Sequence, residues 1–191
     1  EVECAMPGGN CGGLGGNEGN ATWSYDVGTK KLTINGTGTI GGRWETMINI
    51  IPPWKDYRDE IESIEIGEGI TEIVKFLFRG STSVKSIHLP NTLQRVGDCA
   101  FMDCKALTEI SFAKGSKAKL GGGVFEGCTA LTEVALPTGV TAQQQTFSGC
   151  TALAKATVTN VAKSMFAGCT ALKEVIYQEG ATTFGNSPFA G

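Results

Sequence analysis

The sequence predicts a solenoid of consecutive repeats, a right-handed superhelix of mainly short parallel strands with helical turns, preceded by a small N-terminal β cap. Three observations predict this fold class. Phenylalanines recur every 19 to 24 residues from Phe78 onward, a Cys stands three residues after most of them, and an alternating apolar stretch follows. A fixed period of roughly 20 to 50 residues is typical of repeat arrays whose copies stack on one another.

The repeats align in three apolar columns. The ring column contains Phe78, Phe101, Phe125, Phe147, Phe166 and Phe189. The thiol column contains Cys104, Cys128, Cys150 and Cys169, with Ser81 in its first slot. The third column contains Val84, Leu107, Leu131, Leu153 and Leu172. A solenoid core needs apolar side chains at the same position of every coil, so we expect the rings to be buried and stacked. The four column cysteines are expected to be buried, reduced and structural.

Each repeat also contains two short stretches of strand character. In Leu131-Thr-Glu-Val134-Ala-Leu136, apolar and polar residues alternate, which predicts a strand with one buried face. A second run places an apolar residue five positions before each Phe, namely Ile73, Val96, Leu120, Ala142, Val161 and Phe184. The Phe-x-x-Cys segment leaves room only for a helical turn. Each coil is therefore predicted as strand, turn, short strand and helical turn.

The first third of the chain differs from the repeats. We interpret residues 1–58 as an N-terminal β-hairpin cap region with a Gly-rich leader, and residues 59–191 as about six repeats, the last one truncated. The open end of a solenoid exposes unpaired strand edges, which is why a cap is expected there. The chain begins at Glu1 and not at Met, with no charged and then apolar signal sequence before it, which we interpret as a mature or trimmed form. It stops at Gly191, one residue before the position at which the pattern places a Cys, so a C-terminal cap or further repeats remain an open alternative.

The hairpin is predicted over residues 22–40. Trp23 and Tyr25 precede the turn Asp26-Val-Gly-Thr, and Leu32 and Ile34 follow it in the same alternating pattern. Two runs of alternating residues around a turn that contains glycine are typical of a β-hairpin.

The pattern Leu-x-x-Ile-x-Leu-Pro followed by Phe-x-Gly-Cys-x-x-Leu resembles the BspA-like leucine-rich repeats of bacterial surface proteins. The resemblance covers about residues 59–191, and it departs where glycines occupy 121–123 and glutamines occupy 143–145. It implies a leucine-rich-repeat solenoid in a secreted or cell-surface bacterial protein whose signal peptide has been removed. It also implies adhesion to host matrix proteins or to other cells.

Composition excludes several function classes. The 16 basic and 19 acidic residues give a net charge of −3 without a basic block, so a nucleic-acid partner is not expected. No apolar run is long enough to span a membrane, and membrane insertion is not expected. His88 is the only histidine, which removes most metal sites and most catalytic machinery. We expect no cofactor and no metal, and a monomeric chain.

The remaining cysteines and one glycine motif need separate interpretation. Cys4 and Cys11 lie close together in a Gly-rich segment, where they either form a disulfide or remain free. Cys99 lies outside the thiol column, and we expect it to be half exposed. The sequence Gly36-Thr-Gly-Thr-Ile-Gly matches a dinucleotide-binding pattern, but an irregular stretch follows it instead of the helix that holds a pyrophosphate. We interpret it as a glycine-rich strand end.

Acidic residues on the outer strand positions raise the question of catalysis. Glu109, Glu133 and Glu174 share the third strand position, and paired carboxylates perform acid–base work in glycoside hydrolases. A regular row on an open surface lacks the pocket that shifts pKa values, so we interpret these residues as a solvated face. No catalytic residues are expected.

These observations favour a non-catalytic binding or adhesion module that recognises an extracellular protein or glycan through the outward strand positions. The candidate face consists of Glu65, Ser86, His88, Glu109, Ser111, Glu133, Lys155, Thr157, Glu174 and Ile176. An extended ordered surface of this kind suits a macromolecular partner. Two alternatives remain, namely a structural spacer that presents other domains of a longer surface protein and, less favoured, a carbohydrate-active hydrolase.

Overall fold

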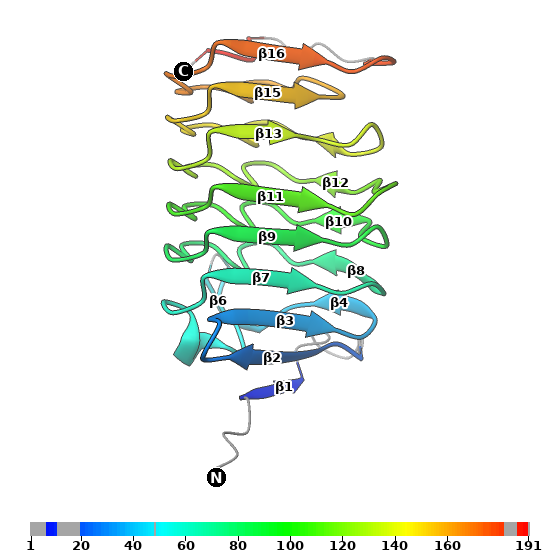
Figure 1. The fold of residues 1–191 in the computed structure, drawn as a ribbon, viewed down its shortest axis with the longest axis vertical. Coiled ribbons are helices and arrows are strands. Elements are labelled where there is room, and N and C mark those ends of the chain that lie inside the picture. Colours follow the sequence, from blue (N-terminus) through cyan, green and yellow to red (C-terminus); the bar gives the residue numbers. More distant parts are fainter. Residues whose placement is uncertain (1–6, 11–19, 48, 182–186, 191) are drawn as a thin grey trace.

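The chain forms a stack of coils, each of which adds one layer along the long axis of the molecule (Figure 1). The computed structural model describes residues 7–10, 20–47, 49–181 and 187–190. In this description β1 (Gly8–Asn10) lies at one end of the stack and β16 (Glu174–Tyr177) at the other. The predicted solenoid of short parallel strands is confirmed.

The first sheet contains the longer strands of the N-terminal part of the stack. Its strands in hydrogen-bonded order are β1, β2 (Thr22–Asp26), β3 (Lys31–Asn35), β7 (Ser63–Ile66), β9 (Ser86–Leu89) and β11 (Glu109–Phe112). From β3 onward the pairing is parallel. Inward residues such as Ile64, Ile66, Ile87 and Leu89 are buried. The alternation of apolar and polar residues in the sequence therefore predicts correctly which side chains lie on the buried side of the sheet.

Three further strands continue the stack as a separate ladder, namely β13 (Glu133–Ala135), β15 (Lys155–Val158) and β16. Within the described residues no hydrogen-bonded ladder joins β11 to β13. Ile110 and Phe112, which point inward next to this break, are only half-buried. The stacking of the longer strands is therefore interrupted once among the described residues, between β11 and β13. The interruption coincides with a connection from Phe112 to Leu120 that is longer than the one from Leu89 to Val96.

The second sheet consists of the shorter strands. In order these are β14 (Thr141–Ala142), β12 (Lys119–Leu120), β10 (Arg95–Val96), β8 (Ile70–Ile73) and β4 (Gly38–Ile40). The predicted inward residues Ile73, Val96, Leu120, Ala142 and Val161 are all buried. Phe184 lies outside the described residues. The two sheets thus face each other across a single continuous core.

The segments around each Phe form turns, so the predicted helical turns are wrong. Residues on both sides of a ring adopt positive φ, as Phe76 (64°) and Gly80 (71°) do around Phe78. The backbone N–H groups of these three residues donate to carbonyl groups of the next coil, at distances of 3.1, 2.8 and 2.7 Å. A helix needs right-handed φ throughout and donates its N–H groups within its own segment. Among the described residues the one helix is the short 3₁₀ element η1 (Lys55–Tyr57).

The ring column forms a continuous stack through the core. Neighbouring rings from Phe78 to Phe189 have centroids 5.0 to 6.0 Å apart and interplanar angles of 1 to 19°. Phe78, Phe101, Phe125, Phe147 and Phe166 are buried, which confirms the predicted register, whereas Phe189 is 55% exposed. Trp54 extends the stack toward the N-terminal end, with its ring 5.2 Å from that of Phe78.

The thiol column is buried as predicted, and its cysteines are free. Each thiol lies within hydrogen-bonding distance of the carbonyl oxygen of the Phe on the preceding coil. The pairs are Cys104 with Phe78, Cys128 with Phe101, Cys150 with Phe125 and Cys169 with Phe147, at 3.4, 3.4, 3.2 and 3.0 Å. Cysteine suits this position because it is a small apolar residue that also carries a weak donor.

The N-terminal segment contains the predicted hairpin, since β2 and β3 pair in antiparallel register across the turn at 27–30. It also joins both sheets of the repeats, because β3 pairs with β7 and β4 pairs with β8. A second hairpin, β5 (Arg43–Thr46) with β6 (Asn49–Ile51), follows β4 and has no counterpart in our sequence interpretation. The capping role of residues 1–58 stays a prediction.

Candidate binding surfaces

The strand face is the outward side of the first sheet and of the ladder β13–β15–β16 that continues it, where the sequence places the partner-binding residues. On β7, β9 and β11 the register aligns two rows across the strands. One row contains Ser63, Ser86 and Glu109, and the other contains Glu65, His88 and Ser111. These rows line a shallow hollow of about 500 Å³ together with Lys31. The structure therefore brings five of the ten predicted face residues together around one hollow.

The other five predicted residues lie on the second ladder. Glu133, Lys155 and Glu174 form one row, and Thr157 and Ile176 belong to the next. The Lys155 ammonium lies 4.0 Å from the Glu133 carboxylate and 3.6 Å from the Glu174 carboxylate. The predicted acidic stripe is thus interrupted by a cation. Because no ladder joins β11 to β13 within the described residues, Glu109 and Glu133 do not lie on hydrogen-bonded strands.

His88 connects the second row of the hollow. Its Nδ1 lies 2.9 Å from the Ser111 hydroxyl oxygen, and its Nε2 lies 3.9 Å from a Glu65 carboxylate oxygen. Lys31 approaches the same carboxylate at 3.4 Å. The order Ser, His and Glu matches the residue types of a hydrolytic triad, but the His88 and Glu65 side chains are 39% and 41% exposed. Such a site gives little of the exclusion of water that closed active sites provide.

Glu62 stands at the edge of the strand face between two lysines. Its carboxylate accepts hydrogen bonds from the Lys30 and Lys85 ammonium groups, at 2.9 and 2.5 Å. These hydrogen bonds, that of Lys85 first, lower the pKa of Glu62 to about 2. The group therefore stays ionised over the whole physiological pH range.

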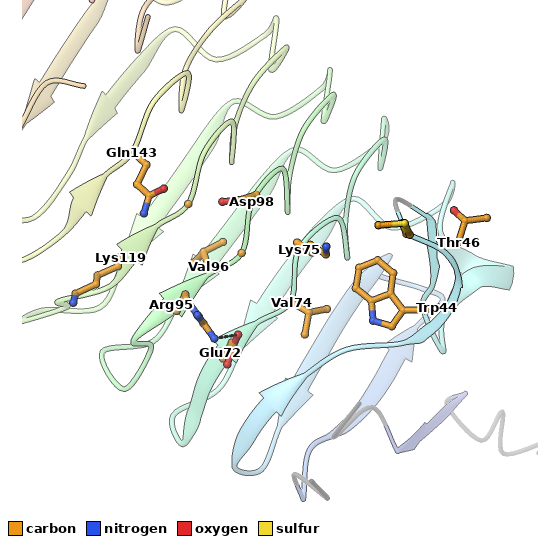
Figure 2. A pocket seen from close by; sticks show the side chains of 13 residues that line it. Trp44, Thr46, Glu72, Val74, Lys75, Arg95, Val96, Asp98, Lys119 and Gln143 are labelled. Carbon is orange, nitrogen blue, oxygen red and sulfur yellow. Dashed lines mark hydrogen bonds and ion pairs between the residues drawn. The ribbon is translucent and has the colours of Figure 1, made fainter. Parts of the chain in front are cut away.

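A larger groove lies on the second sheet, and none of the residues predicted from the sequence as a binding site lines it. Its cavity volume is about 1040 Å³. Figure 2 shows Trp44 beside Val74 and Lys75 at one end, and Lys119 and Gln143 at the other. The β5–β6 hairpin supplies Trp44, Thr46 and Met47, whereas strands β8, β10, β12 and β14 and the residues that follow them supply the other lining residues. Two departures from the repeat pattern could have indicated this groove in the sequence. They are the glycines at 121–123 and the glutamines at 143–145, which contribute Gly121 and Gln143 to its lining.

Two glycines form the floor of this groove. A Cβ atom on Gly97 would lie 2.4 Å from the backbone nitrogen of Lys75, and one on Gly121 would lie 2.4 Å from a carboxylate oxygen of Asp98. Neither position has room for a side chain without a shift of its surroundings. The floor therefore stays bare while neighbouring positions carry long side chains.

The cysteines that the structure describes line neither of these two surfaces. Burial raises the pKa of Cys104 and Cys150 to about 12 and that of Cys169 to about 11, and it also raises the pKa of Cys128. Cys99 is half exposed as expected, and its pKa is raised mainly by partial burial. Cys4 and Cys11 lie outside the described residues.

Within the described ranges, the structure shows neither a cluster of metal ligands nor the strand–helix arrangement that binds a dinucleotide. There, no group of three or more His, Cys, Asp or Glu side chains is arranged to hold a metal ion. The Gly36 motif is followed by strand β5 and not by a helix. In the same ranges, no helix has the length and apolar character needed to cross a membrane.

Coils that repeat a long strand, a turn, a short strand and a second turn around an apolar core define a leucine-rich-repeat type of solenoid. The sequence also matches a family model described as the BspA type leucine-rich repeat region, with six copies over residues 56–163 and 153–191. The chain belongs to this family. A comparison with curated proteins gave no match.

Solved structures with the same fold include three bacterial leucine-rich repeat proteins. A leucine-rich repeat protein from Eubacterium ventriosum is 22% identical, with a TM-score of 0.74 over 93% of this chain and 45% of that one. One from Bacteroides ovatus is 24% identical, with a TM-score of 0.59 over 66% and 33%. A leucine-rich cell surface protein from Faecalibacterium prausnitzii is 22% identical, with a TM-score of 0.53 over 89% and 44%. The chain thus spans less than half the length of these structures.

Proposed function

We propose that this chain is a non-catalytic binding module of a bacterial cell-surface or secreted protein, and that its strand face recognises a macromolecule on a host or neighbouring cell. The observation that carries the proposal is the in-register alignment of polar rows on β7, β9 and β11. A partner that lies across three strands can contact the same position of each coil, which suits an extended protein or glycan surface.

The electrostatics of the strand face support binding over catalysis. Its charged groups are paired in chains along the surface, as in Lys30–Glu62–Lys85 and Glu133–Lys155–Glu174. Exposed ion pairs contribute little to stability, about 0 to 1 kcal/mol each, so these side chains can exchange partners at low cost. Complementary charge across an interface mainly increases the association rate and the specificity.

The surface location is supported by family membership and by the Faecalibacterium prausnitzii neighbour, which is described as a cell surface protein. Leucine-rich repeats of this kind serve typically as non-enzymatic scaffolds, in agreement with the open strand face. A second candidate function is a rigid spacer, which the continuous ring stack from Trp54 to Phe189 favours. A spacer requires no contact between the strand face and a partner.

The test is charge reversal on the strand face. The variant with Glu109→Lys and Glu133→Lys should bind purified extracellular-matrix glycoproteins more slowly wherever the partner presents a basic footprint, and the loss should shrink as salt increases. Both residues are exposed. We therefore expect the free energy of unfolding to change by less than about 1 kcal/mol.

The matched control makes the same charge change away from the strand face. Asp56→Lys with Asp59→Lys alters two exposed residues in and beside η1, and it should leave binding unchanged. Surface plasmon resonance at two salt concentrations and a thermal melt measure both effects. Equal binding by wild type and both variants at low salt would exclude the strand face and favour the spacer.

A further inference from the structure

We propose that the groove on the second sheet binds an acidic oligosaccharide of the uronate type, with carboxylates of the sugar chain against Lys75, Arg95 and Lys119 and one sugar ring against Trp44. This inference goes beyond the proposed function, because the groove lies on the opposite sheet from the strand face. Either surface can bind its partner when the other does not.

The shape of the groove suits an extended ligand that lies across the strands. It extends from Trp44 and Val74, over the bare floor at Gly97 and Gly121, to Gln143. Strands within a sheet are about 4.8 Å apart, so the distance from β8 to β14 is roughly 15 Å. That length holds a short oligosaccharide, and the glycine floor lets its rings approach the backbone.

Charge favours an anionic ligand. Glu72, Arg95 and Lys119 occupy equivalent positions on β8, β10 and β12 and form one row along the groove. Glu72 is already paired with Arg95, whose guanidinium lies 2.6 Å from its carboxylate. Within the described part of the chain, the ammonium of Lys119 has no carboxylate partner. The row therefore presents an uncompensated cation on a chain whose net charge is −3.

The opposite wall of the groove adds a second cation, Lys75, and the carboxylate on that wall, Asp98, already accepts a hydrogen bond. The Lys75 ammonium lies 5.3 Å from the centroid of the Trp44 ring and belongs to none of the ion pairs among the described residues. Asp98 accepts a hydrogen bond from the backbone N–H of Gly122 at 2.8 Å. A neighbouring hollow, which shares Arg95 and Lys119, contributes Lys117 as well. The groove itself has three cationic side chains and two carboxylates. This modest excess of positive charge suits a sugar polymer that carries one carboxylate per one or two sugar units.

The indole and the position of the groove favour a glycan over a peptide. Trp44 is partly buried against the core, and an indole combines a flat apolar face with a polar N–H, so it can pack against the C–H face of a sugar. An extended peptide usually binds by adding a strand to a free sheet edge. The groove instead lies on the face of the sheet, and its strands are paired with their neighbours on both sides from β8 to β12.

The experiment is isothermal titration of the whole chain with hexagalacturonate, with its fully methyl-esterified form and with hexaglutamate. We expect saturable binding of hexagalacturonate that weakens as salt is raised, and at least about tenfold weaker binding of the uncharged ester. Lys119→Gln, at an exposed site, and Trp44→Ala should each weaken binding by about fivefold or more. Trp44→Phe keeps an aromatic ring and should restore most of the affinity. Lys105→Gln, an exposed lysine outside the groove, is the matched control.

Three outcomes would overturn the proposal. The first is absence of saturable hexagalacturonate binding at low ionic strength. The second is unchanged affinity in both Lys119→Gln and Trp44→Ala. The third is equal affinity for hexaglutamate, which would identify a peptide as the occupant. None of these outcomes affects the strand face, whose test uses the variant with Glu109→Lys and Glu133→Lys and a different set of partners.

Discussion

Replacing Phe125 by Ala tests whether the ring stack is the central structural element of the solenoid. Phe125 is fully buried, and its ring lies between those of Phe101 and Phe147, with centroids 5.6 and 5.8 Å away. Its backbone bonds to the next coil persist in the variant, because the N–H of Phe125 donates to the Thr146 carbonyl at 2.9 Å. The substitution therefore isolates the contribution of the side chain.

The expected cost follows from this geometry. Burying a Phe side chain contributes about 1.5 to 3 kcal/mol, and two aromatic contacts add about 0.5 to 1.5 kcal/mol each. The cavity left by the ring raises the total, in line with about 3 to 5 kcal/mol for Phe→Ala in a packed core. Phe189→Ala removes the last ring of the same stack, which is 55% exposed and, among the described residues, stacks on one ring, that of Phe166. It should cost less than about 1 kcal/mol.

Urea denaturation followed by far-ultraviolet circular dichroism gives both free energies. Tryptophan fluorescence, to which Trp54 contributes from its position next to Phe78, reports on the N-terminal coils separately. Both probes are needed because a repeat array can lose one part of its stack before the rest. If Phe125→Ala costs no more than Phe189→Ala, the continuous stack does not determine stability and the reasoning is refuted.

Three further predictions concern ionisable groups. At neutral pH, site-resolved alkylation should modify Cys99 before the four column thiols, and equal rates would contradict the burial of the column. Burial raises the pKa of Cys150 from 9.0 to about 12, so the protonated thiol contributes fully to the free energy of unfolding below about pH 9, and this contribution is lost as the pH rises toward 12. In urea titrations, Cys150→Ala should therefore lose less stability at high pH than the wild type. An identical pH profile for both proteins would argue against this effect of burial. The pKa of Glu62 is lowered from 4.5 to about 2, so the contribution of its carboxylate to the free energy of unfolding is present above about pH 4.5 and is lost as the pH falls through 2. Lys85→Gln should raise the pKa of Glu62, as measured by a carbon-13 NMR titration. An unchanged pKa would show that Lys85 is not the main cause of the shift.

The repeat columns could be predicted from the sequence because each depends on one position of a regular period. A residue such as Leu131 or Cys128 meets its equivalents on the neighbouring coils whatever the details of the connections, so spacing alone identifies it as buried. The alternation in each strand likewise reports which side chains point inward. The order of residues along the outward rows, including Glu65, His88 and Ser111, follows from the same register.

Only the tertiary structure decided the conformation of the turns, the break in the first sheet and the groove. The Phe segments avoid helix because residues such as Phe78 donate their N–H groups to a coil more than twenty residues away, and local periodicity contains no information about such bonds. The groove requires Trp44, from a hairpin between two repeat-like strands, to lie beside Lys75, while Gly97 and Gly121 leave the floor open. The sequence by itself therefore determined which residues form the core, since burial repeats with every coil. The binding surfaces depend on side chains brought together from different coils and from the inserted hairpin, and their separation in space is set by packing and by hydrogen bonds between coils.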